Sequence, residues 1–321
     1  MGVTTTPGTG TDDIQLLEAA DGTRVAYRHW VPDGEVRAAL QIVHGLSEHG
    51  ARYARLASAL TARGIAVAAA DQRGHGRTAD ETGKGRFGDG AGSDAVLDDV
   101  RALGEQLAAA HPGVPLFLLG HSLGSAVALG SAERDGSGLA GLALSGVIGV
   151  APAMGEAATQ LQAAVDAGLG DQPMDALSAF NAPFEPARTP YDWLSRDPAE
   201  VDAYLADPLC GDAVPPTYGY GAGMFELVAR VATADAVRGI PDGLPVLLLA
   251  GRRDPVGGED AAQVTALAEL LRGRGLPVEE RLYADARHEV FNETNRDEVT
   301  ADLLGWLEGR LRTTSPERTS V

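Results

Sequence analysis

Residues 115–125 read PLFLLGHSLGS, and this stretch decides the fold. Leu116–Leu119 is a short apolar run typical of a buried strand, and a helical pattern over Ser122–Glu133 follows it directly. Between them, residues 120–124 fit G-x-S-x-G, in which a serine occupies a strained turn from strand to helix. Gly120 and Gly124 are required where the backbone passes too close for a Cβ. Because 41 of the 321 residues are glycine, the pattern needs support from its surroundings.

Strand and helix patterns alternate on both sides of this stretch. Ile14–Glu18 and Arg24–Trp30 flank a turn at residues 20–22 and predict a hairpin. The other buried-strand candidates are Ala39–Val43, Ile65–Ala70, Leu139–Leu144, Val246–Ala250 and Val278–Tyr283. Helical spacing marks Ala51–Arg63, Asp94–Ala110, Ala261–Leu271 and Arg296–Leu311. Such alternation predicts an α/β fold, a mostly parallel eight-stranded sheet with helices on both faces.

The alternation stops between residues 150 and 235. This part has several prolines, many large apolar side chains and no buried-strand pattern. We therefore expect a sheet core formed by residues 14–149 and 236–312, with 150–235 inserted as a helical cap over one end of the sheet. Residues 1–13 and 313–321 are polar and are expected to be a disordered lead and a loose tail.

Composition excludes several classes of protein. The formal net charge of −19, from 26 basic and 45 acidic residues, disfavours binding to nucleic acid or to anionic membrane surfaces. The sequence has no apolar run long enough to span a membrane and no secretory signal at its start, so we expect a cytoplasmic protein. Cys210 is the only cysteine, which rules out an intramolecular disulfide and favours a structural thiol.

A serine on such a turn becomes a nucleophile only with a base beside it. His288 is the best of the seven histidines because it follows the last strand candidate, which places it at the carboxyl edge of the sheet beside Ser122. His121 adjoins the serine and is expected to point away from it. The remaining histidines lie in loops near the same face, in a hairpin strand or at a helix end: His44, His49, His75, His29 and His111.

The acid that orients the base is predicted to be Asp254, in the loop after the apolar run at 246–250. Asp260 and Asp285 remain rivals, although Asp260 begins a helical pattern and Asp285 is only three residues from His288. The chain order Ser122, Asp254, His288 is the order expected for a nucleophile on this kind of turn.

Acyl transfer also needs donors for the developing oxyanion. The backbone N–H of Leu123 supplies one, and that of Leu46, in the loop after Ala39–Val43, supplies the other. Glu48 and His49 are expected to hold that loop in shape. We expect no metal site, because the histidines lack carboxylates at ligand spacing, and no cofactor, because the glycine-rich residues 83–92 lack the ending of a phosphate-binding loop.

With these residues in view, the chain resembles the monoacylglycerol lipase and lysophospholipase-like branch of the α/β-hydrolase superfamily. The matching segments are HGLSEHGARY (44–53), DQRGHGRT (71–78), GHSLGS (120–125), LSRDPAEVDAYLADPL (194–209), GRRDPVGG (251–258) and ARHEVFNETNRDEV (286–299). The resemblance implies a nucleophile at Ser122, an acid at Asp254, a base at His288 and oxyanion donors at Leu46 and Leu123. It also implies a cap over an acyl-chain pocket that lets the protein touch a membrane or micelle transiently, so the protein would be peripheral there.

We therefore expect a serine hydrolase of carboxylic esters, with monoacylglycerols as substrates and an acyl-enzyme on Ser122. The alternatives are a carboxylesterase of small esters, a lysophospholipase or a hydrolase of another carbonyl compound such as a thioester or peptide. A ligand-binding protein on a hydrolase scaffold is the alternative outside the enzymes. Dehalogenase and epoxide hydrolase chemistry is disfavoured because the turn holds serine in place of aspartate.

Overall fold

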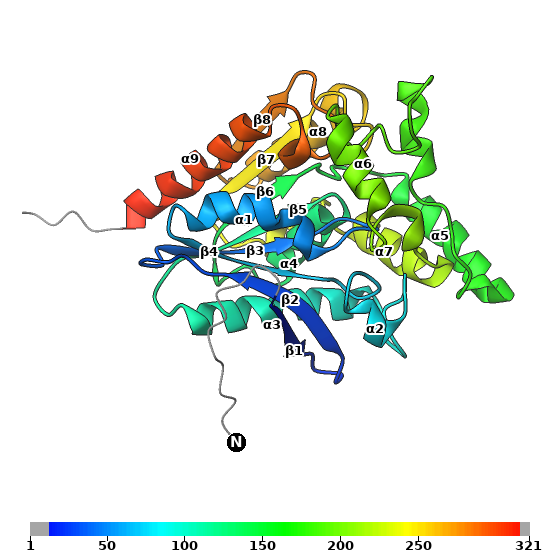
Figure 1. Ribbon diagram of the computed structural model, residues 1–321, viewed down its shortest axis with the longest axis horizontal. Helices are drawn as coiled ribbons and strands as arrows, with labels where there is room; N and C mark the ends of the chain where they lie inside the picture. Colours follow the sequence, from blue (N-terminus) through cyan, green and yellow to red (C-terminus); the bar gives the residue numbers. More distant parts are fainter. Residues whose placement is uncertain (1–12, 315–321) are drawn as a thin grey trace, which may run out of the picture.

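The computed structural model describes residues 13–314, and its centre is one eight-stranded sheet (Figure 1). The strand order is β1-β2-β4-β3-β5-β6-β7-β8. The strands are β1 (Ile14–Glu18), β2 (Arg24–Trp30), β3 (Ala38–Val43), β4 (Ile65–Ala70), β5 (Leu116–His121), β6 (Leu139–Ser145), β7 (Val246–Gly251) and β8 (Val278–Tyr283). The β1–β2 and β2–β4 pairs are antiparallel and all others are parallel. The predicted fold class is confirmed.

Helices cover both faces of the sheet, as its apolar strands require. Every residue of β3, β5 and β7 is buried, which is the pattern of strands enclosed on two sides. On one face pack α1 (Ala54–Thr61) and α9 (Arg296–Thr314). On the other pack α3 (Ser93–Ala110), α4 (Leu123–Asp135) and α8 (Ala262–Gly273). The shorter helices of the core are η1 (Gly50–Tyr53), α2 (Ala79–Thr82), η5 (Ala236–Gly239), η6 (Glu259–Ala261) and η7 (Val290–Asn292).

Two predicted boundaries differ in ways that matter for the site. β5 continues to His121, and α4 begins at Leu123, so Ser122 belongs to neither element. The predicted helix over 51–63 divides into η1 and α1. The predicted lead lies outside the described residues except for Asp13, and the predicted tail lies outside them beyond Thr314, where α9 ends.

Residues 150–235, here called the insertion, connect β6 to β7 without adding a strand to the sheet. Its helices are α5 (Met154–Ala164), η2 (Val165–Leu169), η3 (Ser178–Phe184), α6 (Pro198–Ala206), η4 (Gly211–Ala213) and α7 (Tyr218–Arg230). They gather at one end of the sheet, in green and yellow in Figure 1. α7 joins the core packed around α4, whereas Trp193, Tyr204 and their neighbours form a separate apolar cluster. Within the part of the chain described, no helix combines the length and the apolar character of a membrane span.

Candidate active site

Ser122 lies on the sharp turn between β5 and α4, at the carboxyl edge of the sheet. Its backbone angles, φ 53° and ψ −123°, lie in a region that residues other than glycine rarely occupy. Strain of this kind costs about 1–3 kcal/mol and persists only where the surrounding structure imposes it. A Cβ on Gly120 would lie 2.2 Å from the Gly124 carbonyl oxygen, and one on Gly124 would lie 2.2 Å from the Val43 carbonyl oxygen. The two glycines therefore allow the turn to close.

His288 and Asp254 form a buried pair on the loops after β8 and β7. His288 Nδ1 lies 2.9 Å from Asp254 Oδ2, and their side chains are 2% and 0% exposed. The backbone N–H of Val256 donates to the other carboxylate oxygen over 2.9 Å, which fixes the orientation of Asp254. Burial alone would lower the pKa of His288, but the Asp254 carboxylate, helped by more distant acids, raises it above 6.5. The pair can hold and stabilise an imidazolium.

The structure separates Asp254 from its two rivals. Asp260 is exposed and pairs with Arg252 over 2.9 Å, and Asp285 is exposed on the loop before His288. Neither is placed to orient the base.

The ring of His288 contacts the ring of His121, the residue before Ser122. The centroids of these two imidazoles are 4.9 Å apart, so His121 packs against the candidate base. Its Nδ1 is 3.1 Å from the Ser145 hydroxyl, and burial lowers the pKa of His121 to about 4. His121 is the last residue of β5, and its neutral ring thus packs against His288 directly before Ser122 in the chain.

The loop after β3 lies against the serine turn. A Cβ on Gly45 would come within 3.0 Å of Ser122 Cβ, so the backbone before Leu46 passes directly beside the serine. Leu123 is the first residue of α4, so its N–H has no partner within that helix. The two candidate oxyanion donors, Leu46 and Leu123, therefore follow backbone segments that meet at Ser122.

Buried charges hold this loop in shape. Glu48 Oε1 accepts hydrogen bonds from the Gly45 N–H over 2.6 Å and from the Tyr53 hydroxyl over 2.9 Å. Arg52 donates to Glu48 over 2.9 Å and to both oxygens of Glu289 over 2.6 and 2.8 Å. Burial would raise the pKa of Glu48, but Arg52 lowers it to about 2. The loop that carries Leu46 and the segment after the candidate base are thus joined by one guanidinium.

The insertion packs directly onto the base. The Trp193 indole lies over His288 with ring centroids 4.8 Å apart, and the Glu289 N–H donates to the Leu194 carbonyl over 2.8 Å. Trp193 could not be predicted as part of the site, because nothing in the sequence around it indicates a contact with a residue 95 positions later.

The other candidate nucleophile and the remaining histidines have different surroundings. Burial raises the pKa of the Cys210 thiol well above its usual range, so it is a poor rival nucleophile to Ser122. His29 and His111 pair with each other, with 3.0 Å between their Nε2 atoms. Among the described residues, His49, Asp207 and Cys210 have the composition and proximity of a metal site.

Known proteins resemble this chain over nearly its whole length. It is 30% identical to human monoglyceride lipase over 94% of this chain and 92% of that protein. It is 28% identical to monoacylglycerol lipase from Mycolicibacterium smegmatis over 90% of this chain and 95% of that one. A solved structure of a thermostable carboxyl esterase from Bacillus coagulans, in complex with glycerol, superposes with a TM-score of 0.86 at 28% identity, covering 93% and 98% of the two chains.

Fold, serine turn and relatives together define an α/β-hydrolase of the esterase and lipase kind. The family model described as serine aminopeptidase, S33, matches residues 34–295, and the chain belongs to this family. The predicted membership of the α/β-hydrolase superfamily is thereby confirmed.

Proposed function

We propose that the protein hydrolyses monoacylglycerols through an acyl-enzyme on Ser122, with His288 as base and Asp254 as the acid that orients it. The observation that carries this proposal is the buried His288–Asp254 pair at 2.9 Å, whose imidazole packs against His121, the residue before a serine held at φ 53°. Structural turns rarely bring these features together, and they match the needs of a hydroxyl nucleophile.

The chemistry follows from the placement of each group. His288 takes the proton of Ser122 as its hydroxyl attacks the ester carbonyl, and Asp254 stabilises the resulting imidazolium. The N–H groups of Leu46 and Leu123 bind the oxyanion of the tetrahedral intermediate. His288 then gives the proton to the leaving glycerol, and water activated by the same imidazole releases the fatty acid.

The substrate class rests on the relatives and on the insertion. Two relatives that match at least nine-tenths of the chain are named as lipases of monoacylglycerols, and the superposed esterase holds glycerol. We propose that the insertion acts as the cap of the acyl site, because its Trp193 covers the base. The proposal includes transient contact of the insertion with a micelle or an uncharged lipid surface, and Leu169 and Leu205, each 43% exposed on helices of the insertion, are the apolar side chains available for it.

The test is hydrolysis of glycerol monoesters from short to long acyl chain, with a lysophospholipid alongside. Ser122→Ala should lower kcat by about 10⁶-fold. Ser131→Ala is the matched control, because this serine of α4 has a hydroxyl without a partner among the described residues and should be dispensable. A preference for medium or long monoacylglycerols that vanishes in Ser122→Ala supports the proposal. Near-normal turnover by Ser122→Ala would overturn it.

A second candidate, a carboxylesterase of small esters, is favoured by the carboxyl esterase that superposes at a TM-score of 0.86. Activity confined to the shortest esters would select it and would leave the mechanism intact. Because the family description names an aminopeptidase, an aminoacyl anilide belongs in the substrate panel. Failure of an organophosphonate to label Ser122 would instead select a ligand-binding protein.

A further inference from the structure

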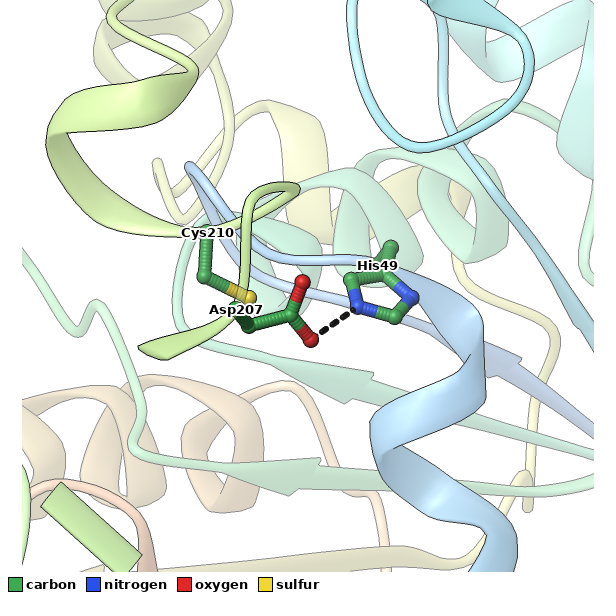
Figure 2. Close-up of side chains that lie close together, drawn as sticks. All are labelled: His49, Asp207 and Cys210. Atoms are coloured by element: carbon green, nitrogen blue, oxygen red, sulfur yellow. Dashed lines mark hydrogen bonds and ion pairs between the residues drawn. The ribbon is translucent and has the colours of Figure 1, made fainter. Parts of the chain in front are cut away.

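Three side chains with metal-binding chemistry meet where the insertion touches the loop that carries Leu46. Figure 2 shows His49 at the end of that loop, facing Asp207 and Cys210 of the insertion. His49 Nε2 is 2.9 Å from Asp207 Oδ2, and one ligand atom from each of the three residues lies within 4.8 Å of the others. Asp207 is the residue after α6, and Cys210 is the residue before η4. Two segments 158 positions apart thus converge on one point.

The orientation of the imidazole allows ligation through Nε2. Nε2 faces the cluster, whereas Nδ1 is buried without a partner among the described residues. The side chain of His49 is 7% exposed and that of Asp207 is 29% exposed, so the cluster is enclosed but open to solvent at the carboxylate. An ion can reach it from that side.

Imidazole, carboxylate and thiolate together are the ligands of zinc-type cations. In a tetrahedral zinc site the ligand atoms lie about 3.3–3.7 Å apart, as follows from metal–ligand distances of about 2.0–2.3 Å. The 2.9 Å between His49 Nε2 and Asp207 Oδ2 must therefore open by about 0.5 Å, and the longest separation in the cluster, at most 4.8 Å, must close by roughly 1 Å, which requires small rotations of these side chains.

The surrounding charge also suits a cation. Arg52 is a positive group that acts on both Asp207 and Cys210, but it is already paired with two buried carboxylates, Glu48 and Glu289. With Asp207 the neighbourhood holds three carboxylates for one guanidinium. A divalent cation here reduces an excess of negative charge.

We propose that His49 Nε2, a carboxylate oxygen of Asp207 and Cys210 Sγ bind a divalent cation of the zinc class, with a fourth position for water. On binding, the thiol proton passes to solvent, and the imidazole proton moves through solvent from Nε2, where it is donated to Asp207, to Nδ1. Spacing along the sequence gave no sign of this site, because the carboxylate and thiol come from the insertion.

The site would tie the insertion to the loop beside Ser122. That junction already contains hydrogen bonds from the Tyr204 hydroxyl and the Gly211 N–H to the Ser47 carbonyl, each over 2.9 Å. A bound ion adds a stronger link at the same place. At 100-fold excess over its Kd, an ion that binds only the folded protein should raise Tm by about 4 °C.

The experiment is a titration of the chelator-treated full chain with Co²⁺ alone, followed by absorption. Because Cys210 is the only cysteine, a thiolate-to-cobalt band can come from no other residue. We expect a saturable band that Zn²⁺ abolishes, with Zn²⁺ also raising Tm. Cys210→Ser should remove the band, and His49→Gln and Asp207→Asn should each weaken binding at least about tenfold.

The matched control is His111→Gln. It breaks the His29–His111 imidazole pair, which is not part of the proposed metal site, and should leave the cobalt band unchanged. Circular dichroism and Tm without metal show whether each variant folds. If Cys210→Ser does not fold, Asp207→Asn replaces it as the test, because Asp207 is the partly exposed ligand. Absence of a thiolate band at any soluble Co²⁺ concentration overturns the proposal. So does a band of equal affinity in His49→Gln and Asp207→Asn. Neither result bears on ester hydrolysis by Ser122.

Discussion

Replacing Asp254 by asparagine tests the proposed mechanism most directly. The carboxylate lies 2.9 Å from His288 Nδ1 in a buried setting, which places the two charge centres of the ionised pair about 4 Å apart. At an effective dielectric constant of about 20, that separation is worth about 4 kcal/mol. At 1.36 kcal/mol per factor of ten, this corresponds to a loss of about 10³-fold in kcat. Loss of control over the imidazole tautomer adds up to another factor of about ten.

The pH profile separates this effect from structural damage. General-base catalysis requires neutral His288, so kcat/KM rises with pH through the pKa of this residue in the free enzyme. In the wild type the Asp254 carboxylate raises that pKa above 6.5 despite burial, so the rise lies above pH 6.5. In Asp254→Asn burial lowers the pKa without this opposing charge, so the rise should move to lower pH while its height falls.

Initial rates on a soluble ester between pH 5 and 9 measure both quantities. Asp260→Asn is the matched control, because this rival acid is exposed and pairs only with Arg252 among the described contacts; it should keep its rate within about twofold. The argument is refuted if Asp254→Asn loses less than tenfold, if its profile does not move, or if Asp260→Asn loses as much.

Three further changes test the surroundings of the site. Gly124→Ala places a Cβ 2.2 Å from the Val43 carbonyl oxygen, so thermal unfolding should show a loss above about 4 kcal/mol, and a wild-type Tm would contradict the steric argument. Trp193→Ala removes the indole whose ring centroid lies 4.8 Å from that of His288. It should lower the free energy of unfolding by about 3–5 kcal/mol and kcat/KM by up to about 10²-fold. Unchanged kinetics would show that the indole does not position the base. Glu48 has a folded pKa of about 2, below its ordinary 4.5, so its contribution to stability is present above pH 4.5 and is lost as pH falls toward 2. Glu48→Gln should flatten the decline in stability over this window, and an unchanged acid slope in denaturant titrations would contradict the assignment.

Local patterns were enough to predict the sheet and the turn that carries the serine. The buried strands β3, β5 and β7 are apolar runs bounded by glycine, proline or charge, so their own sequence determines where they lie. The placement of His288 and Asp254 followed from one rule, that the carboxyl ends of parallel strands share an edge.

Contacts between distant segments could not be predicted in this way. Arg52 and Glu289 are 237 positions apart, and neither has a neighbour whose type or spacing indicates the other. The contact of Trp193 with His288 and that of His49 with Asp207 likewise join the insertion to loops of the core. The insertion has no strand of the sheet to fix its register, so its packing depends on side-chain shape, which one sequence does not reveal.

The Glu48–Arg52–Glu289 link connects the two loops that flank the strained turn at Ser122. One follows β3 and carries Leu46, and the other follows β8 and carries His288. Buried ion pairs gain little net stability, because removing their charges from water offsets most of the attraction. Their value here is geometric: β3 and β8 are separated in the sheet by β5, β6 and β7, so no backbone ladder sets the distance between the loops that follow them. A guanidinium bonded to both carboxylates fixes that distance to within a hydrogen bond. The proposed oxyanion donor, Leu46, and the proposed base, His288, can then keep one geometry around Ser122 even if the insertion moves.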